Sequence, residues 1–345
     1  MADLVSVIVL NYNGKEYLQA CLDSVLAQSY PHFEILFVDN ASGDGSVEFV
    51  RDQYHSVAVI VNDENLGFAG GNNRGVEAAN GSLIVLLNND TIVHEGWLQA
   101  LVDAISPADV GTASSLIKTE GVPEEYYFRN GTINFTGHNI MLAYDDPEDL
   151  FYSSGCSMIF RKLVLGLPFD DDYFAYSEDA WLGLRTRFLG LKVRHTNASI
   201  VDHFGSGTSK RQLSDFITFY QERNRLLNSK LFFSWWTRVR WVPYFGLNCF
   251  LKLGASLLRR KYSFKGLMRA YIWLCTHPRI IAQKRKDLRA EAKAKEKDVI
   301  LAMSCKITNS NSWAGRLGNA LSLAYSCVVG LKTIERSPAR YRAKS

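Results

Sequence analysis

The chain has 345 residues, of which 47% are hydrophobic, 12% aromatic and 21% charged. This composition supplies a core for one large domain with an appendage or for two domains, and it excludes a disordered chain, a small disulfide scaffold and a collagen-like repeat. The six cysteines form no C-x-x-C pair, which favours reduced, mostly buried thiols in a cytosolic chain, and the start MADLVSVIVLNYNG shows no secretory signal.

The charges are divided unevenly along the chain. Residues 1–230 hold 16 Lys and Arg against 30 Asp and Glu, a net charge of −14. Residues 231–345 therefore hold 39 − 16 = 23 basic against 35 − 30 = 5 acidic residues, a net charge of +18, together with five of the seven tryptophans. An acidic part followed by a basic, Trp-rich part indicates two tasks, the second performed against an anionic surface.

The first 110 residues alternate between predicted strands and helices. Short apolar runs that end in polar breakers predict strands at 5–10, 33–40, 57–62 and 82–90. Apolar residues at helical spacing predict helices around 18–26, 46–54, 70–80 and from about 95. This alternation implies a parallel sheet with right-handed crossovers.

Each of the four predicted strands ends in polar residues. These ends are Asn11–Asn13, Asp39–Asn40, Asn62–Asn65 and Asn88–Asp90. In open α/β sheets, ligands bind outside the carboxyl ends of the strands. The row of polar ends therefore marks the predicted site.

The pattern from about 110 to 205 is mixed. Short strands are expected at 111–117, 157–161, 192–196 and 199–204, around an acidic loop at 144–150. Helices are expected at 179–189 and 213–230, and the charged segment 284–297 is typical of a solvated helix.

Two common nucleotide-binding motifs are missing. The turn after the first strand is Asn11-Tyr12-Asn13-Gly14 instead of G-x-G-x-x-G, and no G-x-x-x-x-G-K-[ST] occurs. Asn88-Asn89-Asp90 offers a carboxylate for a divalent cation that bridges a diphosphate, although such residues also simply end strands and cap helices.

Four linked motifs within the first 91 residues resemble glycosyltransferase family 2. They are VSVIVLNYNGKEYL, ILFVDNASGDGS, ENLGFAGGNNRG and LIVLLNNDT, and the likeness continues through YSEDAWLGLRTRFLGLKV, VDHFGSGTS and FYQERNRL to about residue 230. The motifs most resemble the bacterial rhamnosyltransferase-like branch, whose members elongate lipid-linked polysaccharides. The resemblance implies an α/β GT-A fold, in which a Rossmann-like mixed sheet is flanked by helices.

The resemblance also implies a set of donor-binding residues. Asp39 matches the acid that binds the nucleobase edge, and Gly67, Gly70 and Gly71 match positions where the backbone approaches diphosphate or ribose. Asp39 could instead cap a helix, and Arg74 could be an ordinary surface residue. The full implied set is Asn11, Tyr12, Asn13, Asp39, Asn40, Gly67, Gly70, Gly71, Asn72, Arg74, Asn88, Asn89, Asp90 and Arg223.

The implied metal ligands are Asp90 and His203. Asp90 matches the second acid of the family's D-x-D motif, and Asn88 replaces the first. One carboxylate then holds Mg²⁺ or Mn²⁺, so we expect weak metal affinity without donor. Gly205, Ser206 and Gly207, after His203, could donate backbone N–H groups to phosphate.

The implied catalytic residues are Glu178 and Asp179, which match the family's acidic pair. We favour Asp179 as the base that deprotonates the acceptor hydroxyl, with Glu178 supporting it, although acidic residues also suit any helix start. The family's second aspartate is replaced here by Trp181, which either stacks on a sugar or fills the core. Gly155 matches a small residue on the wall near the acceptor.

The segment Trp241–Leu258 contains 18 mostly apolar residues but also Asn248 and Lys252. It is basic and Trp-rich at its edges, which favours a helix lying on anionic lipid; a helical subdomain with a basic face and a true membrane span are the alternatives. No nucleic-acid motif accompanies the basic residues.

The sequence therefore predicts a glycosyltransferase domain at 1–230 and a basic, Trp-rich helical extension at 231–345 that associates with the membrane. The expected reaction is inverting, metal-dependent transfer of a sugar from a nucleotide-sugar, first dTDP-rhamnose and second a UDP-hexose. The expected acceptor is a polyprenyl-diphosphate-linked saccharide in cell-surface polysaccharide synthesis, at the cytoplasmic face of the membrane. The alternatives are a non-catalytic membrane adaptor and a nucleotidyltransferase, whose Gly-rich activation loop is absent.

Overall fold

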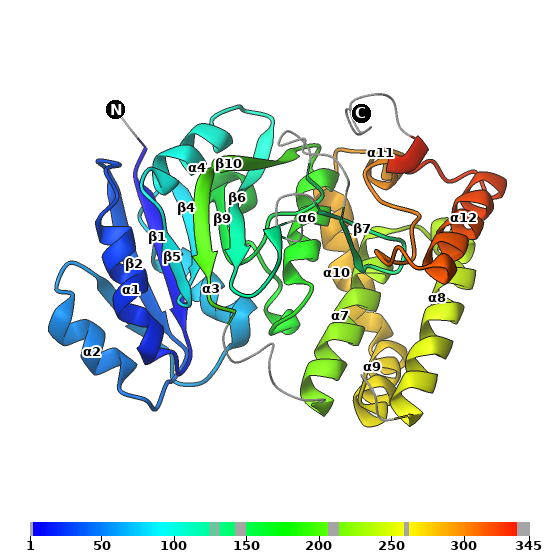
Figure 1. The fold of residues 1–345 in the computed structure, drawn as a ribbon, viewed down its shortest axis with the longest axis horizontal. Helices are drawn as coiled ribbons and strands as arrows, with labels where there is room; N and C mark the ends of the chain where they lie inside the picture. The colour runs from blue at the N-terminus through cyan, green and yellow to red at the C-terminus, as the bar shows by residue number, and fades with distance from the viewer. Residues whose placement is uncertain are drawn as a thin grey trace. The chain divides into compact units, whose positions relative to one another are not determined.

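The computed structural model describes residues 3–124, 127, 131–141, 150–205, 214–258 and 262–336 (Figure 1). The chain forms two compact units. Unit 1 comprises residues 1–129, 147–182 and 191–210, and unit 2 comprises residues 130–146, 183–190 and 211–345. The predicted domain boundary at residue 230 stays a prediction.

Unit 1 is built around an eight-stranded sheet with the order β3-β2-β1-β4-β9-β6-β10-β5. Its strands are β1 (Val5–Asn11), β2 (Phe33–Asp39), β3 (Ala58–Val61), β4 (Leu83–Asn88), β5 (Thr91–Val93), β6 (Val110–Thr119), β9 (Ser157–Arg161) and β10 (Lys192–His203). Its helices are α1 (Lys15–Leu26), α2 (Ser46–Gln53), α3 (Gly67–Ala78), α4 (Trp97–Ile105), α5 (Lys162–Leu165) and the first turn of α6 (Glu178–Phe188), with a 3₁₀ turn, η2, at Asp171–Tyr173.

The sheet is mixed rather than wholly parallel. β1 runs parallel to β2 and β4, β2 to β3, and β6 to β10, as the alternation of strands and helices predicts. β9 runs antiparallel to β4 and β6, and β5 runs antiparallel to β10. The three-residue strand β5 was not predicted, and residues 192–203 form one strand with an irregular register between Thr196 and Ile200 instead of the two predicted. The mixed-sheet fold class is confirmed.

The core of unit 1 lies between the sheet and its helices. Alternate residues of the central strands, such as Val7, Val9 and Val85, are fully buried, and Trp97 of α4 joins the same cluster. The Trp97 Nε1 donates a hydrogen bond of 3.0 Å to the Ser157 hydroxyl, which satisfies the polar atom of this buried ring.

Unit 2 is mainly helical. Its elements are the hairpin β7 (Gly131–Ile133) and β8 (Asn139–Met141), α7 (Asp215–Phe232), α8 (Trp235–Leu257), α9 (Phe264–Thr276), α10 (Pro278–Glu291), α11 (Glu296–Leu301), α12 (Trp313–Val328) and a 3₁₀ turn, η3 (Ile334–Arg336). The hairpin was not predicted. The segment expected to be one charged helix at 284–297 is divided, because α10 ends at Glu291 and α11 begins at Glu296.

Buried charges organise the interior of unit 2. The Glu222 carboxylate accepts hydrogen bonds from Arg225, at 2.7 Å, and from Lys252, at 2.5 Å. The Tyr271 hydroxyl donates a third, at 3.1 Å. The two cations hold the pKa of Glu222 at about 2 against the opposing effect of its burial. Lys252, which interrupts the apolar run 241–258, is thus turned toward the interior of its own unit.

Two further expectations concern the burial of the cysteines and a possible membrane span. All six cysteines are free; Cys21, Cys156 and Cys305 are buried, while Cys275 and Cys327 are exposed, so burial holds for only half of them. Among the described residues, no helix has both the length and the apolar character that a membrane span requires.

We predict that Gly75→Ala destabilises unit 1. A Cβ at Gly75, on α3, would lie 2.6 Å from Cγ2 of Ile8 and 3.0 Å from Cγ2 of Val38, so the helix must move away from β1 and β2. Overpacking of this kind costs about 1–3 kcal/mol. Urea denaturation measures the loss. The control is Gly246→Ala on α8, where no atom lies within 4 Å of the added carbon; equal stability of the two variants would contradict the prediction.

Candidate functional site

The sheet topology brings the predicted site residues to one edge of unit 1. The carboxyl ends of β1, β2 and β4 lie in register, since Asn11 pairs with Asp39 and Leu10 with Asn88. The two antiparallel strands begin where their neighbours end, because Ser157 of β9 pairs with Leu87 and Thr91 of β5 pairs with His203. Asn11, Asp39, Asn88, Asn89, Asp90, Gly155 and His203 therefore lie at or beside the same edge.

A hydrogen-bond network joins the ends of β1, β2 and β4. The Asn11 Nδ2 donates to the Asp39 carboxylate at 2.8 Å and to the Ser42 hydroxyl at 3.1 Å. The Asn11 Oδ1 accepts from the Asn89 Nδ2 at 2.6 Å, and the second Asp39 oxygen accepts from the Ser42 backbone N–H at 2.8 Å. Asn11 and Asp39 are buried, so in this structure they organise the edge rather than face solvent.

Asn40 extends this network toward α3. Its Nδ2 donates to the Gly67 carbonyl at 2.8 Å, and its Oδ1 accepts from Asn62 at 2.9 Å. Tyr12 and Asn13 differ from these buried amides: both are exposed, and Tyr12 keeps 52% of its surface accessible. Of the residues after β1, the Tyr12 ring is thus available to stack on a planar ligand.

The glycines of α3 are packed against protein. A Cβ at Gly67 would lie 2.4 Å from the Phe174 carbonyl oxygen, and one at Gly71 would lie 2.5 Å from Leu10. Gly70 is less confined, with Leu66 at 3.0 Å, and a Cβ at Gly155 would meet the Phe68 ring at 2.8 Å. Their lack of a side chain serves close packing beside the edge; a role in approaching phosphate stays a prediction.

Asn72 and Arg74 face different surroundings on α3. Asn72 is buried, and its Nδ2 donates to the Phe68 carbonyl of its own helix at 2.9 Å. Arg74 is exposed and pairs with Glu77 at 3.0 Å. Both the donor-binding role of Arg74 and the alternative of an ordinary surface residue stay predictions.

Asp90 and His203 meet across the β5–β10 pair. The His203 Nε2 lies 3.3 Å from the Asp90 Oδ1, and the Asp90 carbonyl accepts a hydrogen bond from the Phe204 N–H at 3.0 Å. A carboxylate beside an imidazole suits Mg²⁺ or Mn²⁺ when substrate and water supply the remaining ligands. Among the described residues no group of three or more His, Cys, Asp or Glu side chains is placed to hold a metal, so this pair would leave most coordination positions open.

Glu178 and Asp179 begin α6. The Asp179 Oδ1 accepts from the Ala180 N–H at 2.7 Å, and the Glu178 Oε2 is buried with no hydrogen-bond partner in the described part of the chain. Burial raises the pKa of both carboxyls well above the usual range, and the neighbouring charge of Asp179 raises the pKa of Glu178 further. One of the two groups is therefore poised to carry a proton near neutral pH.

The loop before α6 has an unusual backbone. Phe174, Tyr176 and Ser177 all have positive φ, between 57° and 73°. In the described residues, the other non-glycine residues with positive φ are Asn13 and Ala41, in the loops after β1 and β2. Backbone strain in folded proteins gathers at functional sites, and here it gathers in the loops that carry the predicted site.

The remaining predicted residues have mixed surroundings. Trp181 is buried and its ring lies 6.2 Å from that of Tyr173, so it packs within unit 1. Arg223 belongs to α7 of unit 2, where its guanidinium lies 4.8–5.2 Å from the rings of Phe219, Tyr220 and Trp273. Gly205 follows β10 with a φ of 59°, while Ser206 and Gly207 lie outside the described residues.

The structure adds Ser42, which sequence reasoning missed, and it gives the partners of Asn73, which the family resemblance places on the helix that faces the site. Ser42 binds both Asn11 and Asn13, and Asn73 holds the loop before α6 through hydrogen bonds to the Phe169 carbonyl at 2.8 Å and to Asp171 at 2.6 Å. Ser42 belongs to the matching motif ILFVDNASGDGS, so the motif carried the signal. The hydrogen bond from Asn73 to Asp171 joins residues that are 98 positions apart in the sequence, and no local pattern predicts it.

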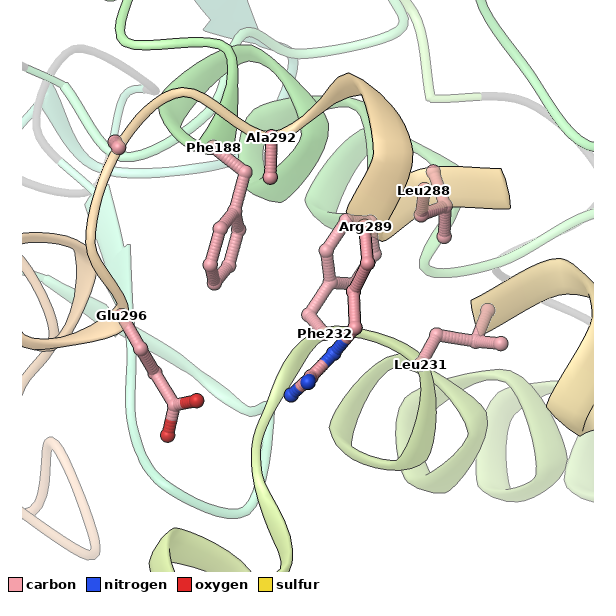
Figure 2. Close-up of a pocket in the computed structure, with 8 residues that line it drawn as sticks. Phe188, Leu231, Phe232, Leu288, Arg289, Ala292 and Glu296 are labelled. Carbon is pink, nitrogen blue, oxygen red and sulfur yellow. The ribbon is translucent and has the colours of Figure 1, made fainter. Parts of the chain in front are cut away.

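A separate pocket of about 250 Å³ lies in unit 2 (Figure 2). Its lining is Phe188, Leu231, Phe232, Leu288, Arg289, Ala292, Ala294 and Glu296. The pocket contains none of the predicted site residues, and its volume is below the roughly 300–1,000 Å³ common for ligand pockets. We therefore assign no donor site to it.

Comparisons with known proteins find glycosyltransferases. Residues 6–166 match the model of "Glycosyl transferase family 2". The chain is 36% identical to glycosyltransferase AglE of Haloferax volcanii over 132 residues, which is 37% of this chain and 41% of AglE. It is 28% identical to an uncharacterized glycosyltransferase of Haemophilus influenzae over 240 residues, which is 63% of this chain and 74% of that protein.

A solved structure resembles the whole fold. Mannosyltransferase PcManGT from Pyrobaculum calidifontis, in complex with GDP-Man and Mn²⁺, superposes with a TM-score of 0.53 at 16% identity, over 96% of this chain and 86% of that one. The chain spans about two fifths of AglE, so its own substrates do not follow from that likeness. The fold is GT-A. Residues 6–166, which match the family 2 model, include Asp90 but end before His203.

Proposed function

We propose that the protein transfers a sugar from a nucleotide-sugar donor to a saccharide acceptor. The observation that carries the proposal is the meeting of Asp90 and His203 at the sheet edge organised by Asn11 and Asp39. A carboxylate and an imidazole there suit a cation and a diphosphate, and the exposed Tyr12 ring suits a base. The catalytic domain in this proposal is residues 1–230.

Asp179 is the base in this proposal. Inversion requires a group that takes the proton of the acceptor hydroxyl on the face opposite the departing diphosphate. Asp179 is fixed at the start of α6 by the Ala180 N–H, and its raised pKa strengthens it as a proton acceptor. Glu178, whose pKa is raised by burial and by Asp179, accompanies it.

Asp90 and His203 are the proposed ligands of Mg²⁺ or Mn²⁺. The bound cation offsets the charge that develops on the leaving nucleoside diphosphate. Asn88, in place of a first acid, leaves Asp90 as the single carboxylate of this motif. Binding of cation and donor should therefore depend on each other.

The finer assignments are supported by resemblance and charge. The donor is dTDP-rhamnose in the first place, from the likeness of the motifs to the rhamnosyltransferase-like branch, and a UDP-hexose in the second. The acceptor is a polyprenyl-diphosphate-linked saccharide, used in cell-surface polysaccharide synthesis at the cytoplasmic face of the membrane. The net charge of +18 over residues 231–345 supports a partner with an anionic surface.

A non-catalytic adaptor that kept the fold is the second candidate. The full packing of the Gly67 and Gly71 backbones against protein is compatible with it. Donor hydrolysis or transfer by the purified protein would exclude it.

Asp90→Asn should abolish the cooperation between metal and nucleotide. We expect Mn²⁺ with a nucleoside diphosphate to raise the melting temperature of the wild-type protein by several degrees more than either alone, because the cation bridges Asp90 and the diphosphate. A thermal-shift panel of nucleotide-sugars with Mg²⁺ and Mn²⁺ measures this and ranks the donors.

The matched control for this experiment is Asp202→Asn. Asp202 precedes His203 on the same strand but pairs with His94 at 2.7 Å. It should keep the cooperative shift. An undiminished shift in Asp90→Asn would remove Asp90 from the site.

Asp179→Asn should lower kcat by about 10²–10⁴-fold, since an amide cannot accept the proton. Donor binding should persist, because Asp179 does not belong to the proposed donor-binding set. Single-turnover transfer and donor titration measure the two effects. The control is Asp103→Asn. Asp103 is exposed on α4, and its carboxylate accepts a hydrogen bond from Gln99. Near-normal turnover of Asp179→Asn would exclude it as the base.

On the acid side of its pH profile, kcat should fall at a higher pH than an ordinary aspartate base would give. Because burial raises the pKa of Asp179, the base is protonated and transfer is lost as the pH falls through that raised value, above the ordinary aspartate value of about 3.9. The profile is measured with saturating donor and acceptor. A limb at or below pH 4 would show that the titrating base is not a carboxyl with the environment of Asp179.

A further inference from the structure

Two helices of unit 2, α8 and α12, contact each other (Figure 1). The Tyr244 hydroxyl donates to the Ser322 carbonyl at 3.0 Å, and the Tyr325 hydroxyl donates to the Arg240 carbonyl at 3.0 Å. The rings of Tyr244 and Tyr325 lie 5.5 Å apart. These contacts join Tyr244 to Ser322 and Arg240 to Tyr325, so the two helices run in opposite directions where they meet.

The polar side of α8 faces the interior of unit 2. Lys252 binds Glu222, and Asn248 accepts a hydrogen bond from Arg225 at 3.1 Å. Thr237 and Ser256 are also buried, and so are the aromatic residues Trp241 and Tyr244. The outer side of the helix consists of exposed apolar residues, which are Trp235, Trp236, Val239, Val242, Leu247, Phe250, Leu251 and Leu257.

The helix α12 has the same reversed arrangement. Its buried residues are Gly315, Ser322 and Ser326. Its exposed large apolar residues are Trp313, Leu317, Leu321 and Val328. The exposed apolar residues of α8 and α12 together form what we call the α8–α12 face.

A helix on a water-facing surface normally buries its apolar stripe and exposes its polar one. In α8 and α12 most large apolar side chains are instead exposed, while Lys252, Ser256, Ser322 and Ser326 are buried. Large exposed apolar patches of this kind mark interaction surfaces. The α8–α12 face is therefore matched to an apolar environment outside the protein.

The charges around the face select an anionic partner. The sequence has no Asp or Glu between Arg223 and Lys286, and none between Val299 and Ile334. Arg240, Arg316 and Lys332 are exposed on or beside the two helices. Two copies of such a face would place like charges together, whereas anionic headgroups would neutralise them.

We propose that the α8–α12 face lies in the headgroup and upper acyl region of an anionic bilayer, with both helices parallel to the membrane plane. Exposed tryptophans at the ends of the face, Trp235, Trp236 and Trp313, suit that interface, and no described helix has the apolar length for a span. This inference rests on the proposed membrane location but not on the transfer reaction.

Flotation of the full-length protein with vesicles tests the face. The wild-type protein should float with vesicles of phosphatidylcholine and phosphatidylglycerol, and at least tenfold less with phosphatidylcholine alone. The double variant Phe250→Glu with Leu321→Glu places a carboxylate on each helix at positions that are 74% and 63% exposed. It should lower partitioning to the anionic vesicles at least tenfold, about 1.4 kcal/mol.

The matched control is Leu163→Glu, on α5 of unit 1. Leu163 is 96% exposed and lies outside the face, so the same change of chemistry there should leave flotation unchanged. Circular dichroism and the melting temperature verify folding, and Trp236→Glu is the second variant if the double variant unfolds.

Three outcomes would overturn the inference. They are absence of wild-type binding to anionic vesicles, equal binding by the face variants, and a wild-type dimer in light scattering that the face variants convert to monomer. Transfer to a water-soluble saccharide, measured on the same proteins, separates this inference from the proposed reaction. Loss of docking with normal transfer supports the face, and docking without any transfer supports the face while contradicting the reaction.

Discussion

The side-chain amide of Asn11 holds together the ends of three strands. It donates to Asp39 at the end of β2 and accepts from Asn89 directly after β4, so the edge where β1, β2 and β4 finish has one fixed geometry. Asp90 follows Asn89 in the chain and meets His203 of β10. The position of the proposed cation ligands therefore depends on a buried amide whose donor and acceptor are both used.

Backbone strain near this edge lies in the loops rather than in the strands. Positive φ values occur at Asn13 and Ala41 after β1 and β2, and at Phe174, Tyr176 and Ser177 before α6. Hydrogen bonds from Asn73 to Phe169 and Asp171 hold the last of these loops on α3. Rigid strands with specifically held loops at their ends are the arrangement that positions a reacting pair of substrates.

In unit 2, a cluster of buried charges determines which side of α8 faces outward. Glu222, Arg225 and Lys252 neutralise one another inside it, and this draws the polar side of α8 inward. The apolar side of the helix is left outside as a consequence. Lys252, which in the sequence argues against a true membrane span, pairs with Glu222 inside the unit, so its charge is absent from the outer face.

Much of unit 1 was predictable from local patterns. The apolar runs predicted β1, β2, β3 and β4 to within about two residues. In β1 and β4 nearly every residue is buried, and strands buried on both faces need continuous apolar sequence. The helix α3 begins at Gly67, three residues before the predicted start, because Asn65 accepts the Gly67 N–H at 2.8 Å. The short strand β5 and the hairpin β7–β8 were missed, because three-residue strands have no period to detect.

The sequence by itself determined the α/β class, the row of polar strand ends and the separation of an acidic part from a basic one, because each is written in neighbouring residues. Only the tertiary structure decided that β9 and β5 reverse direction, that Asp90 meets His203 and that Asn11 locks Asp39. It also decided which side of α8 faces outward. These properties depend on partners tens to more than a hundred residues apart, and pairing over such distances leaves no periodic trace in the chain.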